Sequence, residues 1–320
     1  MVKTAPDNAM ASTRDAFAAA LIEAASVDRR ICLVSADSLK AARATAFAEK
    51  FPERVFELGI CEQGAVAFAA GLAATGLIPV FCTYGCFITM RACEQIRTFV
   101  AYPGLNAKFV GLNGGIYGGE REGVTHMVFE DIGILRAIPR IEIVVPADAG
   151  QARKATHAIM NRPGPVYLRI GSGRDPVVFD DSTGFEFGKA RPVREYGTDA
   201  AIFANGPVLK RAIIAADKLA GQGIKTTLVE VHTIKPLDIE TIASVLRQTR
   251  AAVTVEDHNI YGGLGSAIAE VIAEHQPARL IRLGLQDVFP ESGDAEQLLD
   301  HFGMGVQHIC DAVHTLLARA

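Results

Sequence analysis

The chain has 320 residues, 49% of them hydrophobic and 21% charged, which is enough apolar material for about two domains with buried cores. The formal net charge is -4 and no basic run is longer than Arg29-Arg30, so we expect neither a nucleic acid nor an anionic membrane as a partner. The six cysteines lack the paired spacing of metal sites, so we expect reduced thiols in a cytoplasmic protein.

Short apolar runs alternate with helical patterns over the first half of the chain. The runs lie at residues 31–35, 55–58, 79–83, 108–112, 142–145 and 166–170, and the helical patterns at 14–26, 62–74, 91–100, 130–137 and 149–160. Nearly continuous apolar strands are typical of a parallel sheet that helices cover on both faces. The predicted fold class is therefore α/β, with a first domain over residues 12–172.

The stretch 63–90 carries no formal charge and is long enough to cross a bilayer. It is rich in Ala and Gly, is interrupted at Gly76 and Pro79, and then becomes β-branched and aromatic. We interpret it as a buried helix followed by a buried strand.

Residues 173–198 are rich in Gly, Asp and Pro and interrupt the alternation, so we interpret them as a linker. A second, smaller α/β domain is predicted over residues 199–320. Its strands are expected at 200–204, 226–231, 252–256 and 280–283, and its helices at 208–220, 239–249, 266–274, 295–302 and 306–318.

Two short motifs mark junctions between a strand and a helix. Glu62 is the first residue of a predicted helix, and no residue after it carries a formal charge as far as Leu77. A buried carboxylate is rare without a task or a partner, although an acid at a helix N-terminus is also favoured by the macrodipole. Tyr84 and Phe87 follow the next strand, where parallel sheets form ligand crevices, and core packing is the structural alternative.

Two segments are rich in glycine. Residues 113–126 contain five glycines within ten positions and end in His126, a residue type suited to proton transfer near neutral pH. We expect a loop that approaches a ligand, with a flexible surface loop as the alternative. Residues 262–266 resemble a phosphate-binding turn but lack the following acid, so we interpret them as a structural turn.

Taken in order, these motifs resemble the C-terminal portion of transketolases, nearly from end to end. The resembling segments include 12–17, 59–63, 123–126, 167–169, 234–238 and 256–266. The resemblance implies a pyrimidine-binding domain followed by a transketolase C-terminal-like domain. It also implies a thiamine-diphosphate-dependent transfer of a two-carbon ketol unit from a ketose, expected to be a sugar phosphate, to an aldose.

The resemblance implies roles for residues at the cofactor end. Glu62 matches the glutamate that hydrogen-bonds a pyrimidine nitrogen of thiamine diphosphate, and a proton-sharing carboxyl in an apolar site fits that task. Tyr84 and Phe87 match the aromatic residues that sandwich the pyrimidine ring. Arg91 follows this pair and is expected to bind the cofactor with them.

At the substrate end, His126 matches a histidine that contacts the sugar near its reacting carbons. Glu122 stands where the family has an aspartate that binds a sugar hydroxyl, and Asp37 is expected beside the substrate. Arg14 and Arg169 match arginines that hold a terminal phosphate, a task that suits a bidentate guanidinium. Glu62 and His126 are therefore the expected catalytic residues.

The departures from the family pattern cluster at the substrate end. Ala41 replaces a phosphate-contacting serine, Asn113 replaces a histidine, and Met127 replaces a glutamine. Arg121 resembles an insertion beside Glu122. We hypothesise that the chemistry is kept and the sugar is unusual. Replacement charge would then come from Arg121 or from Lys40.

The motif that binds diphosphate and Mg²⁺ in this family, Gly-Asp-Gly followed by Asn-Asn, is absent from this sequence. We therefore expect no metal ligands here and a separate N-terminal transketolase subunit that supplies the diphosphate-binding domain and the Mg²⁺ ligands. The expected assembly is an α2β2 heterotetramer.

Other activities remain open at this point. A 1-deoxyxylulose-5-phosphate synthase and the β subunit of a 2-oxo-acid dehydrogenase share this layout, but the Gly-Val-Thr-His ending and the arginine pair favour sugar transfer. Decarboxylation of pyruvate without glycolaldehyde transfer would indicate one of these two. A non-catalytic regulatory subunit is the remaining alternative, and full activity with Glu62→Ala would indicate it.

Overall fold

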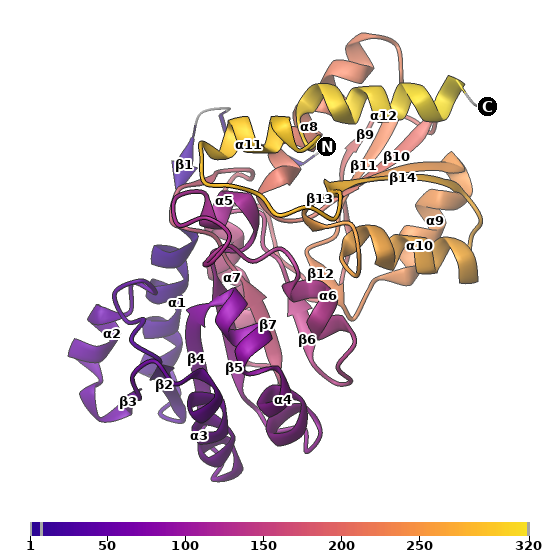
Figure 1. Cartoon of the computed structure of the whole chain (residues 1–320). Coiled ribbons are helices and arrows are strands. Elements are labelled where there is room, and N and C mark those ends of the chain that lie inside the picture. Colours follow the sequence, from indigo (N-terminus) through magenta and orange to yellow (C-terminus); the bar gives the residue numbers. More distant parts are fainter. Residues whose placement is uncertain (1, 7–8, 319–320) are drawn as a thin grey trace.

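The computed structural model describes residues 2–6 and 9–318. They form two α/β domains that pack side by side (Figure 1). The first half has strands β1 (Met10–Ala11), β2 (Ile31–Ser35), β3 (Val55–Glu57), β4 (Ile78–Tyr84), β5 (Lys108–Leu112), β6 (Glu142–Val144), β7 (Val166–Arg169) and β8 (Asp175–Pro176). Its helices are α1 (Thr13–Val27), α2 (Thr45–Lys50), η1 (Pro52–Arg54), α3 (Glu62–Ala74), η2 (Phe87–Arg91), α4 (Cys93–Gln95), η3 (Ile96–Ala101), α5 (Gly115–Gly119), α6 (Asp131–Arg136) and α7 (Ala149–Met160).

The second half repeats the α/β alternation. Its strands are β9 (Arg191–Glu195), β10 (Ala200–Ala204), β11 (Thr226–Glu230), β12 (Thr233–Lys235), β13 (Ala251–Asn259) and β14 (Arg279–Leu285). Its helices are η4 (Gly206–Val208), α8 (Leu209–Gly221), α9 (Ile239–Thr249), α10 (Leu264–Glu274), α11 (Ala295–His301) and α12 (Val306–Ala318). The predicted fold class of two α/β domains is confirmed.

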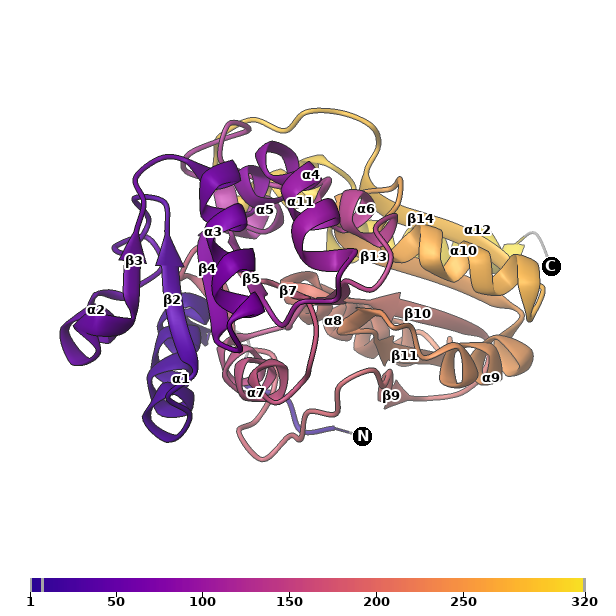
Figure 2. The same ribbon diagram turned by 90° about the horizontal axis from the view of Figure 1, so that it is seen from below.

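The sheets are mostly parallel, as their apolar strands predict. The seven-stranded sheet has the order β12-β6-β7-β5-β4-β2-β3, and the five-stranded sheet has the order β14-β13-β10-β11-β9. Antiparallel pairing is found at one edge of each, where β12 joins β6 and β9 joins β11. Helices α1 and α7 lie on one face of the first sheet, and α3, α4 and α6 lie on the other (Figure 2). The carboxyl ends of the first sheet's strands therefore lead into the segments that carry the candidate residues.

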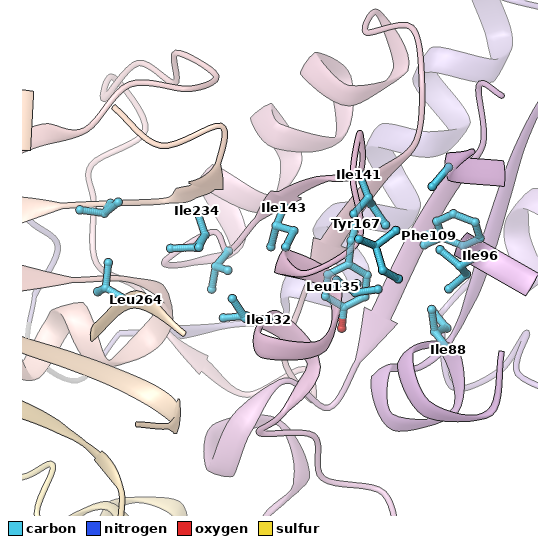
Figure 3. Close-up of a cluster of buried hydrophobic side chains, with 14 of the residues drawn as sticks. Ile88, Ile96, Phe109, Ile132, Leu135, Ile141, Ile143, Tyr167, Ile234 and Leu264 are labelled. Carbon is cyan, nitrogen blue, oxygen red and sulfur yellow. The ribbon is translucent and has the colours of Figure 1, made fainter. Parts of the chain in front are cut away.

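The hydrophobic core continues from one domain into the other. Buried side chains of the first sheet and α6, such as Phe109 and Ile132, belong to the same cluster as Ile234 on β12 and Leu264 on α10 (Figure 3). Burial of this kind stabilises by roughly 25 cal/mol per Å² of apolar surface. The cluster therefore fixes the orientation of the two domains, because separating them would expose it to water.

Several elements differ from the sequence predictions. The linker predicted over 173–198 contains β8 and β9, and β9 is an edge strand of the second sheet. Its sequence, Arg-Pro-Val-Arg-Glu, hides the strand because it lacks an apolar run, and its proline is tolerated only at an edge. The strand β12 was missed because three residues are too few to show a period.

Two helical segments also differ. The regular helix predicted over 91–100 is divided into η2, α4 and η3, in which η2 and η3 are wider π-type turns. The loop predicted over 113–126 contains the short helix α5. The stretch 63–90 divides into α3 and β4 as predicted, and among the described residues no helix is long and apolar enough to cross a membrane.

Candidate active site

Glu62 is the first residue of α3, and its side chain is buried with 5% of its surface exposed. Its Oε1 accepts a hydrogen bond from Nη1 of Arg91 at 2.8 Å. Arg91 is therefore the partner that a buried acidic side chain requires. The structure thus brings together an acidic side chain and a guanidinium that lie 29 residues apart in sequence.

Arg91 connects Glu62 to the aromatic residues of the site. Its guanidinium carbon lies 3.9 Å from the ring centroid of Phe87, a distance that allows a cation–π interaction. Both residues lie on the π-type turn η2, and such turns occur frequently at functional sites. The Arg91 side chain remains about half exposed, so it can also contact a ligand.

Tyr84, Phe87 and His126 form a cluster of three rings. The centroids of Tyr84 and Phe87 are 5.5 Å apart with an interplanar angle of 66°. The His126 ring meets Tyr84 at 4.9 Å and Phe87 at 5.2 Å, also edge to face. A ring sandwiched between two others needs about 7 Å between them, twice the roughly 3.5 Å of van der Waals contact. A pyrimidine therefore does not fit between Tyr84 and Phe87 as they lie here. It can stack on one of these rings only from the side that faces away from the other ring.

His126 is half-buried at the end of the glycine-rich segment. Its Nδ1 lies 2.9 Å from Oγ1 of Thr125, and the Thr125 carbonyl accepts a contact from Sγ of Cys86 at 3.6 Å. These contacts hold the end of the segment against the turn that carries Phe87. His126 therefore lies beside Tyr84 and Phe87, and its contact with the sugar stays a prediction.

Arg14 is buried and surrounded by neutral oxygens. Its Nε donates to the Gly171 carbonyl at 2.9 Å, its Nη1 to the Ala41 carbonyl at 3.0 Å, and its Nη2 to Oδ1 of Asn113. Burial lowers the pKa of Arg14, while Tyr84 and Glu122, among other groups, act in the opposite direction. Nδ2 of Asn113 is buried and has no hydrogen-bond partner among the described residues.

Arg169 lies in the interface between the domains, packed against Gly114. It is 4% exposed, and its Nε donates to Oδ2 of Asp131 at 2.8 Å. Its Nη2 donates to the carbonyls of Val128 and Asp257, each at 2.9 Å. A substrate phosphate could reach this guanidinium only if these contacts were exchanged.

Asp37 and Glu122 are both exposed at the edge of the site. Asp37 has a positive φ of 56°, and its N–H donates to Oε1 of Glu57 at 2.7 Å. The N–H of Gly59 donates to the same oxygen at 3.0 Å. Burial opposes ionisation of Glu57, but these bonds and one from Ser35 lower its pKa. Glu57 thus connects the turns that carry Asp37 and Gly59.

Sequence reasoning assigned no role to Glu57, Asp131 or Asp257. Their positions could have revealed them. Glu57 ends β3, and Asp131 and Asp257 lie in buried segments, where a carboxylate needs a partner. Among the residues that the structure describes, no three His, Cys, Asp or Glu side chains gather as a set of metal ligands.

Comparison with known proteins assigns the two domains. Residues 9–173 match the family of the transketolase pyrimidine-binding domain, and residues 188–309 match that of the transketolase C-terminal domain. The chain belongs to the transketolase family. The resemblance predicted from its motifs is therefore confirmed, with the two transketolase domains in the predicted order.

Relatives of this transketolase chain include subunits and longer enzymes. It is 40% identical over 308 residues to a 6-deoxy-6-sulfo-D-fructose transketolase subunit of Clostridium sp. (strain MSTE9), covering 96% of this chain and 94% of that one. It is 34% identical to the 1-deoxy-D-xylulose-5-phosphate synthase of Syntrophotalea carbinolica, covering 96% of this chain but 48% of the synthase. A solved split-gene transketolase, described as an inactive β4 tetramer, is 35% identical with a TM-score of 0.87 and covers 97% of this chain and 99% of that one.

Proposed function

We propose that this transketolase-family chain is the subunit that presents the pyrimidine-end residues of a thiamine-diphosphate-dependent transketolase. The assembled enzyme would transfer a two-carbon ketol unit from a ketose to an aldose. The observation that carries the proposal is the continuous arrangement of Glu62, Arg91, Phe87, Tyr84 and His126 at the carboxyl end of the first sheet.

Thiamine diphosphate, when bound, would supply the nucleophile and the electron sink for cleaving the bond next to a ketose carbonyl. The residues present suit its pyrimidine end. Because Oε1 of Glu62 is held by Arg91, Oε2 is the oxygen that remains for a pyrimidine nitrogen. Tyr84 and Phe87 are both partly exposed, so an outer ring face can accept the pyrimidine by stacking.

We propose that the substrate lies along His126, Glu122 and Arg14, with Asp37 at its edge. The closeness of Glu122, Tyr84 and Arg14 supports this, since Glu122 and Tyr84 both act electrostatically on the Arg14 guanidinium. Arg14 would hold an anionic end group, such as the phosphate of a sugar phosphate. Arg169 would join it only after leaving Asp131.

A partner chain would complete the site with the diphosphate-binding domain and the Mg²⁺ ligands, in an α2β2 assembly. Apolar side chains beside the site support an interface there, because Ile60, Phe68 and Met90 are 73%, 38% and 44% exposed. The solved split-gene relative supports partner dependence as well, since it is described as an inactive tetramer.

Calorimetric titration with thiamine diphosphate and Mg²⁺ tests this proposal. We expect binding by the pair formed with a candidate N-terminal subunit and none by the chain alone. The Glu62→Gln variant keeps the shape of the side chain and is the matched test of chemistry. It should reduce ketol transfer by the pair about 10²- to 10⁴-fold, the range of a lost acid–base group. Tight binding by the chain alone, or full activity of Glu62→Gln, would contradict the proposal.

A second candidate is a 1-deoxyxylulose-5-phosphate synthase-like activity, because the synthase of Syntrophotalea carbinolica aligns over nearly this whole chain. The two reactions differ in their donors. Consumption of pyruvate by the assembled pair, without transfer of glycolaldehyde from a ketose, would favour the synthase. Transfer from a ketose without pyruvate would favour the transketolase.

A further inference from the structure

The glycine-rich segment 113–126, which carries Glu122 and His126, is held by the second domain at three separate places. Helix α5 within this segment lies beside α11 of the second domain in both views (Figures 1 and 2). The contacts come from β13, from α8 with α11, and from the connection that precedes α11. Each of the three uses a different kind of interaction.

The first contact is a helix cap supplied by another domain. The Asp257 carboxylate on β13 accepts hydrogen bonds from the N–H groups of Ile116 at 2.8 Å and Tyr117 at 3.0 Å. Asp257 is 2% exposed, so these bonds lie out of water. Gly115 has a φ of 74°, and a β-carbon there would lie 2.3 Å from Cγ of Asp257. The start of α5 is therefore fitted to this carboxylate.

The second contact joins side chains of three helices. The Tyr117 hydroxyl donates to Oε1 of Glu296 on α11. Burial raises the pKa of Tyr117, so the hydroxyl stays protonated and able to donate. Arg211 on α8 is 5% exposed and donates to Oε2 of Glu296, and its Nη1 donates to Oδ1 of Asp300 at 2.6 Å. The buried guanidinium thus fixes Glu296 in the orientation that receives Tyr117.

The third contact is made by backbone and rings. The N–H of Gly293 donates to the carbonyl of Glu120 at 2.9 Å, two residues before Glu122. The Phe289 ring of the same connection meets Phe129, just after His126, edge to face at 6.0 Å. The chain is therefore anchored to the second domain on both sides of Glu122 and His126.

We propose that the second domain acts as a clamp that shapes the substrate-facing segment, with Tyr117, Glu296 and Arg211 as positioning residues. This proposal rests on the proposed function. The clamp touches residues 116, 117 and 120, whereas Glu62 and Arg91 lie on α3 and η2 outside it. Loosening the clamp therefore changes the placement of Glu122 and His126 and leaves the Glu62–Arg91 pair in place.

The test compares Tyr117→Phe and Glu296→Ala with the unchanged chain, each assembled with the N-terminal subunit. Tyr117→Phe removes only the hydroxyl, so it folds even if Glu296→Ala does not. Gln297→Ala is the matched control, because that side chain is exposed on the same helix. Hydrogen–deuterium exchange of residues 113–126, the KM for the ketose and the Kd for thiamine diphosphate are measured.

We expect faster exchange in residues 113–126 and a rise of about tenfold in the KM for the ketose, the size of effect that the loss of one hydrogen bond can have. The Kd for thiamine diphosphate should change by less than about twofold, because the loss is confined to contacts with the sugar. Glu296→Gln should give a KM between those of Glu296→Ala and the unchanged chain, since the amide oxygen of glutamine still accepts a hydrogen bond from one partner. Gln297→Ala should behave like the unchanged chain.

The clamp would be overturned if the variants left the exchange of residues 113–126 unchanged. It would also be overturned if they raised the ketose KM and the cofactor Kd by the same factor. The proposed function fails in a different way. If the unchanged pair transfers no ketol unit from any ketose, that function is rejected, while the exchange rates of residues 113–126 still decide whether the clamp exists.

Discussion

Two glycine-rich turns, one in each domain, lead into helices whose first N–H groups bind a buried carboxylate, but the surroundings of the two turns differ. Asp257 caps the start of α5 after the turn at 113–115, and its neighbour Glu256 caps the start of α10 after the turn at 262–263. The Glu256 carboxylate accepts from Leu264 N–H at 2.6 Å and from Gly265 N–H at 2.7 Å. Adjacent residues on β13 thus serve two helices that lie on opposite sides of the strand.

The comparison shows that a glycine-rich turn before a helix need not be a ligand site. In both turns a buried carboxylate takes the N–H groups that would otherwise bind an anion. The turn at 262–266 is thus a structural turn, which confirms that prediction. The segments after the two turns differ, since residues 116–126 continue to the aromatic cluster, whereas Gly262 packs against Gly133 of α6.

The largest expected effect comes from breaking the cap of the first turn. Asp257→Ala leaves the N–H groups of Ile116 and Tyr117 buried without an acceptor and removes a carboxylate near Arg169. We expect a loss of about 4 kcal/mol in the free energy of unfolding, as when one partner of a buried pair is removed. Thermal unfolding measures it, and Asp257→Asn should lose less. Equal stability of both variants to the unchanged chain would contradict the cap.

The glycines themselves sharpen the comparison. Gly115→Ala and Gly262→Ala both place a side chain at a positive φ, 74° and 80°, against a close neighbour. Each should lower the free energy of unfolding by up to about 3 kcal/mol through strain and overpacking. Ketol transfer measured below the unfolding temperature should fall with Gly115→Ala and persist with Gly262→Ala. Equal losses of activity would mean that the two turns are not functionally distinct.

Glu256 gives the second turn a pH dependence close to neutral pH. Burial raises the pKa of Glu256 to about 7, against hydrogen bonds from Gly265 and Leu264 that lower it. The folded protein therefore binds more protons than the unfolded chain between about pH 4.5 and 7, so this residue's contribution to stability decreases as the pH rises through that window. Glu256→Gln should gain about 2 kcal/mol relative to the unchanged chain between pH 5 and pH 7. Melting temperatures at these two pH values measure the gain, and a constant difference would contradict it.

The smallest effect is expected at the outer side of the second turn. The Ser266 hydroxyl accepts from Gly262 N–H at 2.9 Å and donates to the Ile260 carbonyl at 3.2 Å. Ser266→Ala should lower the free energy of unfolding by about 1 kcal/mol, the value of an ordinary hydrogen bond. Ketol transfer should stay the same. A loss of activity here would connect the second turn to the site.

The sequence predicted most of the parallel sheet, and it named candidate residues that the structure brings into contact, such as Glu62 with Arg91 and Tyr84 with Phe87. Apolar runs such as β2 and β5 were placed correctly because strands buried on both faces show themselves by composition alone. The antiparallel edge strands β9 and β12 were missed, because edge strands carry polar residues or are short.

Partnerships between side chains were not readable from local pattern. Nothing near Arg169 in the sequence indicates that Asp131 neutralises it, and nothing near Tyr117 indicates Glu296, which lies 179 residues away. The edge-to-face contact of Tyr84 with Phe87 was also hidden, because ring orientation depends on the π-type turn that begins at Phe87. Residue types predicted which chemistry was present, and tertiary contacts decide which groups are free to perform it.

The strand β12 has a consequence for how this protein can be divided. Residues 233–235 come after β11 of the second sheet, yet they pair with β6 and form an edge of the first sheet. A cut between the two family matches, near residue 180, would leave β6 exposed as an open edge and β12 without a sheet. The two domains are therefore exchangeable between proteins only as one block. Recombination or engineering that respects the family boundaries alone should yield aggregating fragments.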